Sequence, residues 1–311
     1  MQHKKLIIVS ASIAVAAVVF SALLFSGTID GIYRAITKKP DKDGFYTVNS
    51  YTAQAIGEFT DKSVALFAKK LNAVKSDYFA DSKVYFALIP DKTFYLSGYE
   101  TADYPKLKAS LDKSLSDFNI IDLYPFLSID DYYKTDGHWR QEKLVPIADI
   151  LLRNMGASPV KNEYTQMTKD NFVGSYSKHI KGKPPLETLV YLTDKAIDAS
   201  TVDNYQNPAF TSVYDIAKLD SALPYDVFLS GATPLVTIKS PLARSLKELV
   251  VFRDSFASSL APLLLDEYCK VTLIDLRYMA SPLLKEMISF TGQDVLFIYS
   301  TNIVKSSAIL R

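Results

Sequence analysis

The apolar residues of this chain fall into blocks whose spacing predicts alternating helices and strands. Between residues 61 and 78 they recur at steps of three and four, which predicts an amphipathic helix. A continuous apolar run over 84–89, closed by Pro90, predicts a buried strand. The segment 143–155 has helical spacing and stops at Gly156, so a second helix is predicted there.

The last sixty residues have the clearest pattern. Three apolar runs predict buried strands, at 249–252, 271–276 and 295–299. Helical spacing predicts the helices between them, over 258–268 and 282–290. Strands and helices that alternate with short connections indicate a parallel sheet covered by helices, so the predicted fold class is α/β. The segment 158–207 is polar and aperiodic, and we expect loops and short edge elements around the main sheet.

The N-terminal pattern predicts a transmembrane helix ahead of this domain. Leu6–Phe25 is apolar apart from three serines and follows Lys4 and Lys5. A helix of about twenty residues spans about 30 Å, the thickness of the hydrocarbon core. The lysines place the N-terminus in the cytoplasm and the rest of the chain outside. The alternative is a cleaved signal peptide, which has a shorter apolar region, but the exit at 21–27 offers only a poor cleavage site.

These patterns divide the chain into a cytoplasmic tail at 1–5, a membrane anchor or signal peptide at 6–25, a polar linker at 26–44 and an extracytoplasmic domain at 45–311. The 35 basic and 34 acidic residues nearly cancel, so no strong field favours a nucleic-acid partner. A single cysteine, Cys269, permits neither an internal disulfide nor a cysteine-based metal site, and we expect it to be buried and structural.

Ser255 occupies the turn between the strand predicted at 249–252 and the helix after it. A serine at such a turn projects from the sheet, and free N–H groups at the start of a helix can stabilise a developing oxyanion. The position is that of a nucleophile elbow, although the glycines of the G-x-S-x-G signature are absent. The alternative is that Ser255 or Ser258 only caps the helix.

His138 and Asp136 lie in one short motif, Thr135-Asp136-Gly137-His138-Trp139. A serine nucleophile needs a base, usually histidine, and a carboxylate that holds the base in the right tautomer. His3 precedes the predicted anchor, and His179 is expected to face solvent, so His138 is the candidate base. In an extended segment residues i and i+2 share a side, which lets Asp136 orient His138. Metal binding is the alternative, but no second His or Cys cluster completes a site, and no metal or cofactor is expected.

The two motifs together resemble those of the DHHW protein family, which is similar to the SGNH-hydrolase-like domains of bacterial alginate O-acetylation proteins. The resemblance covers roughly 45–300 and includes the segments 84–92, 132–139, 228–231, 252–256 and 273–278. It implies an SGNH-hydrolase-like parallel sheet flanked by helices. Gly137 stands where the family has its first motif histidine, and the alginate-type relatives keep only the Asp and the second His. The Asp-x-His block precedes the serine block, which is the alginate-type order.

The resemblance implies roles for the three central residues. Ser255 would be the nucleophile, His138 the general base and acid, and Asp136 the orienting carboxylate. Oxyanion donors would be the backbone N–H groups of Ser255 and Phe256.

Four further side chains are lower-ranked candidates for oxyanion or substrate contacts, namely Tyr278, Asn302, Trp139 and Arg253. Trp139 either stacks on a sugar or packs against His138. Arg253 either contacts substrate or forms a local ion pair with Asp254 that fixes the elbow.

The function implied by the resemblance is that of an exported acyl-transfer enzyme, either an O-acetyltransferase or an acetylesterase, acting on a cell-surface polysaccharide or cell-wall polymer. An acetyl-serine would be discharged to a sugar hydroxyl or to water. The expected partners are the glycan substrate, the membrane and a membrane-bound acyl-donor protein. The alternative is a catalytically weak glycan-binding or assembly protein of the same fold.

Overall fold

The structure is a computed structural model that describes residues 38–311. The expected anchor at 6–25 and most of the expected linker lie outside these residues. Within 38–311, no helix combines the length and the apolar character needed to cross a membrane.

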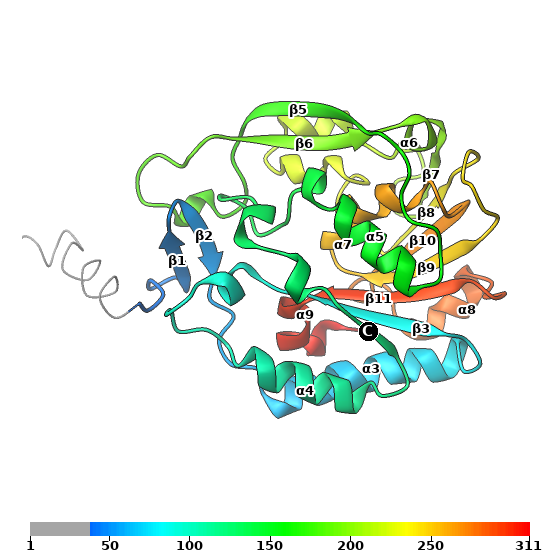
Figure 1. The fold of residues 1–311 in the computed structure, drawn as a ribbon, viewed down its shortest axis with the longest axis horizontal. Coiled ribbons are helices and arrows are strands. Elements are labelled where there is room, and N and C mark those ends of the chain that lie inside the picture. Colours follow the sequence, from blue (N-terminus) through cyan, green and yellow to red (C-terminus); the bar gives the residue numbers. More distant parts are fainter. Residues whose placement is uncertain (1–37) are drawn as a thin grey trace, which may run out of the picture.

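A seven-stranded sheet in the order β4-β3-β11-β9-β10-β8-β7 runs through the centre of the molecule (Figure 1). Its strands, in chain order, are β3 Val84–Ile89, β4 Asn119–Asp122, β7 Thr201–Asn204, β8 Leu235–Lys239, β9 Glu248–Arg253, β10 Lys270–Ile274 and β11 Asp294–Ser300. Neighbours from β4 to β10 pair in parallel, whereas β8 is antiparallel to both β10 and β7. The predicted α/β class with a mainly parallel sheet is therefore confirmed.

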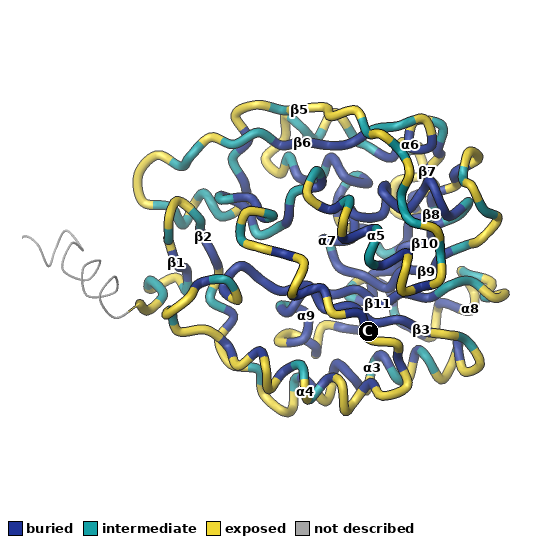
Figure 2. Tube along the Cα trace, viewed as in Figure 1, coloured by how far each residue is buried: buried dark blue, intermediate teal, exposed yellow. Residues whose placement is uncertain are grey.

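Each face of the sheet is covered by its own apolar layer, because successive strand residues point to opposite sides. On one face β3 contributes Val84, Phe86 and Leu88 to a core with helices α3 (Asp61–Tyr78) and α4 (Tyr104–Ser114). Its other residues join α5 (Val145–Asn154) and α7 (Phe256–Leu260) on the opposite face. Figure 2 shows the sheet buried between these layers, while α4 is exposed on its outer side.

The best-predicted elements are those with strong local signals. Helix α3 has the predicted bounds, and the Thr60 side chain caps it by accepting the N–H of Ser63 at 3.1 Å. Strand β3 also has the predicted bounds. Helix α5 is one to two residues shorter than predicted at each end.

The helix predicted at 258–268 is wrong in extent. Helix α7 ends at Leu260 and continues as a 3-10 turn over Ala261–Leu264. Pro262 has no N–H to donate four residues back, so the chain tightens there. The helix predicted at 282–290 is likewise only a 3-10 turn and the four-residue α8 (Leu284–Met287), which lacks a side-chain cap. Cys269 is half-buried, not buried as expected, because it lies at a chain bend with its Sγ 3.4 Å from the Lys247 carbonyl.

Two hairpins lie outside the main sheet, at the left and the top of Figure 1. The first joins β1 (Phe45–Val48) to β2 (Tyr51–Gln54), and the second joins β5 (Thr165–Phe172) to β6 (Glu187–Thr193). Within 158–207, β7 and α6 (Lys195–Ala199) are short elements of the expected kind, but the eight-residue β5 is not. Strand β5 is exposed along almost its whole length, so it carries none of the apolar alternation by which strands are recognised.

Candidate active site

Ser255 lies in a tight turn between the end of β9 at Arg253 and the start of α7 at Phe256. The Asp254 carboxylate fixes this turn by accepting the N–H of Phe256 at 3.0 Å and the N–H of Ser300, at the end of β11, at 2.8 Å. The Ser255 side chain makes no capping hydrogen bond to α7. Ser255 thus occupies the N-cap position of α7 without capping it through its side chain. Ser258 lies inside α7 and accepts a hydrogen bond from Arg253, so the helix-cap alternative is wrong for Ser258.

The Asp136–His138 motif forms a loop whose ends are tied together. Tyr132 and Trp139 face each other in an antiparallel bridge, and the N–H of Tyr133 donates to the His138 carbonyl at 3.1 Å. At the tip of the loop the Asp136 Oδ1 accepts the His138 N–H at 2.9 Å and lies 2.6 Å from His138 Nδ1. Asp136 therefore braces both the main chain and the ring of His138.

The loop brings His138 directly to Ser255. His138 Nε2 lies 2.8 Å from Ser255 Oγ, which is hydrogen-bond distance. Ser255, His138 and Asp136, hereafter the triad, thus form one continuous chain of hydrogen bonds. The Asp136 side chain is 4% exposed and the His138 side chain 21% exposed. The carboxylate is shielded from water, whereas the base remains accessible.

Asp136 is held as an anion. Burial by itself raises the pKa of this carboxyl. The charge and hydrogen bond of His138 oppose that effect, together with the backbone N–H groups of Ser175 and His138, and the pKa of Asp136 lies well below its ordinary range. An ionised Asp136 accepts a hydrogen bond from the Nδ1–H group, which leaves Nε2 free to act as the base toward Ser255.

The His138 ring is also held by aromatic packing. It stacks on the ring of Tyr225, with centroids 4.0 Å apart and planes 10° apart, and it contacts the ring of Phe256 at 4.9 Å. Tyr225 is buried and donates its hydroxyl to Ser259 Oγ at 2.8 Å, which ties it to α7. Sequence reasoning missed Tyr225, because nothing in its local pattern indicates this contact.

Polar groups from four segments that are distant in the sequence bind the backbone of residues 133–136, which precede His138 in the motif loop. The Glu187 carboxylate accepts the N–H groups of Lys134 and Thr135 at 2.7 and 2.8 Å. The backbone N–H groups of Thr52 and Tyr176 donate to the carbonyls of Lys134 and Thr135, at 2.8 and 2.9 Å. The Lys92 ammonium donates to the carbonyls of Tyr133 and Asp136, at 3.0 and 2.7 Å. None of these side chains was predicted from the sequence, since the contacts arise only in the fold.

The structure corrects the roles expected for Trp139 and Phe256. Trp139 is fully buried and donates its indole N–H to the Phe256 carbonyl at 2.9 Å, so it is no platform for a sugar. It packs edge-on against Phe256 and not against His138. The Phe256 N–H already donates to Asp254, so it is not free to serve an oxyanion.

The two roles expected for Arg253, a substrate contact or an ion pair with Asp254, are also wrong. It is fully buried, and its guanidinium donates to Ser258 Oγ at 3.1 Å and weakly to the Asp254 carbonyl at 3.4 Å. It forms no ion pair with the Asp254 carboxylate, whose two oxygens bind backbone N–H groups. Arg253 therefore supports the turn at Ser255 from the interior of the protein and does not reach a substrate.

Tyr278 and Asn302 are not joined to the triad. Tyr278 is 51% exposed on the turn after β10, where the Arg277 guanidinium lies 5.2 Å above its ring. Asn302 lies in α9 (Thr301–Lys305), just past the end of β11. Within residues 38–311, neither side chain forms a hydrogen bond with Ser255, His138 or Asp136.

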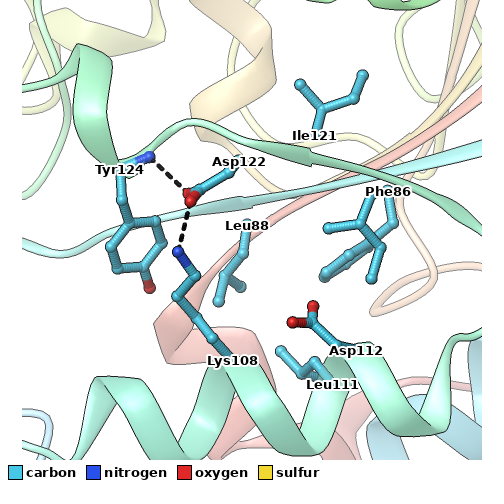
Figure 3. A pocket seen from close by; sticks show the side chains of 9 residues that line it. Phe86, Leu88, Lys108, Leu111, Asp112, Ile121, Asp122 and Tyr124 are labelled. Atoms are coloured by element: carbon cyan, nitrogen blue, oxygen red, sulfur yellow. Dashed lines mark hydrogen bonds and ion pairs between the residues drawn. The ribbon is translucent and has the colours of Figure 1, made fainter.

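A small pocket between α4 and β4 lies apart from the triad (Figure 3). Its volume is about 30 Å³, and its walls are mainly apolar side chains of β3, β4 and α4. The ion pair between Lys108 and Asp122, 2.5 Å apart, stands at one side of it. Such a volume holds water but no sugar ring. In the described part of the chain, no group of three or more His, Cys, Asp or Glu side chains is placed to hold a metal ion.

The fold and the triad geometry define an α/β protein with a Ser-His-Asp hydrogen-bond chain. The structure is similar to that of a DHHW family protein from Eubacterium siraeum, with a TM-score of 0.70 and 22% identity over 86% of this chain and 94% of that chain. It is also similar to Bacillus cereus PatB1, with a TM-score of 0.63 and 21% identity over 84% and 97% of the two chains. PatB1 with a sulfonyl adduct gives a TM-score of 0.62 and 20% identity over the same shares.

At these identities the comparisons establish a shared fold. The resemblance to the DHHW family inferred from the motifs is confirmed at that level. No family model matches the sequence, and no curated protein matches it.

Proposed function

We propose that this protein is an acyl-transfer enzyme that forms an acetyl-serine at Ser255. The observation that carries the proposal is the continuous hydrogen-bond chain from Ser255 Oγ through the His138 ring to the Asp136 carboxylate. Such a chain activates a serine hydroxyl, whereas a purely structural serine has no need of a base braced by a buried carboxylate.

The geometry supports the following sequence of steps. Ser255 Oγ attacks the carbonyl carbon of an acetyl donor while His138 Nε2 takes the hydroxyl proton. The charge that forms on the imidazole is balanced by Asp136. His138 then gives the proton to the leaving oxygen as the donor's C–O bond breaks. In the second half, an acceptor hydroxyl loses its proton to His138 and attacks the acetyl-serine, and the proton returns to Ser255. The Ser255 N–H is the remaining backbone candidate for holding the oxyanion.

The proposed acceptor is a hydroxyl of a cell-surface polysaccharide or cell-wall polymer, or water if the protein is an esterase. This part of the proposal is supported by the motif resemblance and by the apolar segment at 6–25, which would anchor the domain outside the membrane beside a membrane-bound acyl donor. The sulfonyl adduct of PatB1 supports a different part of the proposal, the nucleophilic serine, because a sulfonyl electrophile combines with a nucleophilic side chain.

The proposal is tested with the full-length protein in detergent and a nitrophenyl acetate substrate. We expect turnover that falls to background in Ser255→Ala and His138→Ala. The matched control is His179→Ala, because His179 stacks on Phe45 at 3.8 Å and has no contact with the triad. A sulfonyl fluoride should modify Ser255 in the wild type, as read by peptide mass spectrometry. Unchanged turnover in Ser255→Ala would contradict the proposal.

Transfer and hydrolysis are then separated by acceptor dependence. An O-acetyltransferase should deposit acetyl groups on a purified cell-wall glycan faster than it hydrolyses the ester. Hydrolysis alone, unaffected by the glycan, would identify an acetylesterase.

A further inference from the structure

Lys92 is a buried cation at the carboxyl end of β3. It follows the Ile89-Pro90-Asp91 turn and is 3% exposed. Within residues 38–311 its ammonium forms no ion pair within 4.0 Å, and its two hydrogen bonds go to main-chain carbonyls of the motif loop. Removing an ammonium from water is unfavourable unless its surroundings compensate. Lys92 therefore occupies a position in which a neutral side chain would be easier to bury.

The Lys92 ammonium contacts a triad residue directly, through the main chain of Asp136. It donates to the Asp136 carbonyl at 2.7 Å, while the carboxylate of the same residue lies 2.6 Å from His138 Nδ1. Asp136 is thus fixed at both ends, by Lys92 through its peptide group and by His138 and Ser175 through its side chain.

This contact also sets the position of the loop relative to the nucleophile. Lys92 comes from the end of β3, and Ser255 comes from the end of β9, and both strands pair in parallel with β11. The carboxyl ends of parallel strands meet at the same edge of a sheet. Lys92 therefore ties the loop that carries His138 to the same sheet edge from which Ser255 projects.

The charged groups around Lys92 favour an ammonium at this position. The carboxylates of Asp136, Glu187 and Asp91 act on it electrostatically, and its Nζ lies 5.1 Å from the centre of the Tyr176 ring. Burial outweighs these effects and lowers the pKa of Lys92 to about 7. A rise in pH through this value removes the proton, and a neutral amine is a weaker donor to the two carbonyls.

We propose that Lys92 is a positioning residue of the active site, whose ammonium holds the Asp136 main chain so that His138 meets Ser255 at hydrogen-bond distance. This inference rests on the proposed acyl-transfer function. It assigns to Lys92 no contact with substrate; the residue acts through Asp136 and His138.

The test uses the full-length protein and two substitutions at Lys92, assayed by ester turnover from acidic to alkaline pH. Lys92→Met removes the charge and both hydrogen bonds, and we expect kcat to fall about 10²-fold with little change in KM, the effect of misplacing a catalytic group by about 1 Å. Lys92→Arg keeps a cation that stays protonated, so its activity should persist to higher pH than that of the wild type.

A destabilised fold is separated from a misplaced loop by a control in the opposite apolar layer. Leu71→Ala in α3 removes a fully buried side chain far from the motif loop, so it should lower Tm and leave kcat unchanged. If Lys92→Met does not fold, the test depends on Lys92→Arg. The proposal is overturned if the folded arginine variant loses activity at the same alkaline pH as the wild type. It is also overturned if Lys92→Met has the kcat of the wild type.

A second readout does not depend on turnover. The His138 ring proton in the short hydrogen bond to Asp136 should give a far-downfield NMR signal that disappears in His138→Ala. We expect Lys92→Met to shift or lose this signal, and an unchanged signal in that variant argues against the proposal. If Ser255→Ala keeps full turnover, the proposed function fails instead, and the NMR signal still tests whether Lys92 positions His138.

Discussion

The ring of His138 lies flat against the ring of Tyr225, with a centroid separation of 4.0 Å. Tyr225 is itself fixed, because it is buried and its hydroxyl donates to Ser259 on α7. Helix α7 begins immediately after Ser255. The base is therefore aligned by the same helix that follows the nucleophile, through packing as well as through hydrogen bonds.

This relationship predicts different effects for two substitutions of Tyr225. Tyr225→Ala removes the surface on which the imidazole rests, and we expect kcat to fall on the order of 10²-fold. Tyr225→Phe keeps the ring and loses only the hydrogen bond to Ser259, so kcat should change little while stability falls by about 1 kcal/mol. Ester turnover and urea unfolding measure the two quantities. Equal losses of kcat in both variants would show that the hydroxyl and not the ring surface matters.

Replacement of Asp136 by Asn should nearly abolish turnover. An amide at this position carries no charge and can donate its N–H to Nδ1, which favours the wrong histidine tautomer, and the expected fall in kcat is about 10⁴-fold. Asp112→Asn, an exposed carboxylate on α4, is the matched control and should behave like the wild type. Comparable activity in Asp136→Asn and the control would remove Asp136 from the triad.

The depressed pKa of Asp136 also predicts how stability responds to acid. Burial raises this pKa, but His138 and the backbone N–H groups lower it by more than burial raises it. The Asp136 carboxyl therefore binds a proton less readily in the folded state than in the unfolded state. Stability from this group is fully present above the ordinary aspartate value of 3.8 and is lost as the pH falls below it toward the folded-state pKa. Urea unfolding at a series of acidic pH values should show a shallower pH dependence for Asp136→Asn than for the wild type. Parallel curves would contradict the assignment.

Gly137 is small because Tyr176 occupies the adjacent space. A Cβ at position 137 would lie 2.6 Å from the Tyr176 hydroxyl oxygen and 2.9 Å from the ring carbon that bears it. Gly137→His, which restores the first histidine of the Asp-His-His-Trp motif, should therefore lower stability by about 1–3 kcal/mol through overpacking.

The same contact predicts a rescue. Because Tyr176→Ala vacates the space, the double variant Gly137→His/Tyr176→Ala should be more stable than the sum of the two single changes predicts. A double-mutant cycle in urea measures this coupling. Additive effects would mean that Tyr176 is not what restricts position 137.

The sequence predicted the parts of the fold that local patterns encode. The buried run at Val84–Ile89 and the capped helix at Asp61–Tyr78 have the expected bounds, because an apolar run and a threonine cap are local signals. Strand β5 was missed because its side chains are exposed, and its pairing with β6 comes from backbone hydrogen bonds that leave no apolar pattern.

The residues of the candidate site divide in the same way, into those that a local sequence pattern indicates and those that it does not. His138 could be chosen from the sequence because only three histidines compete, and the structure places it beside Ser255. Whether these residues catalyse acyl transfer remains a prediction. Trp139 was misjudged because burial depends on what packs over a side chain. Lys92 and Tyr225 could not be found, since neither lies in a local pattern that indicates chemistry and their contacts with Asp136 and His138 arise only in the fold.

Strand β11 has a consequence for the order in which the molecule can be assembled. It lies between β3 and β9, although it is the last strand in the described sequence. Lys92 belongs to the half of the sheet on one side of β11, and Ser255 belongs to the half on the other, with Asp254 bonded to the N–H of Ser300 at the strand's end. A ribosome makes the strands of both halves before it makes residues 294–300. We expect the nascent chain to lack catalytic activity until β11 has inserted between the two halves of the sheet.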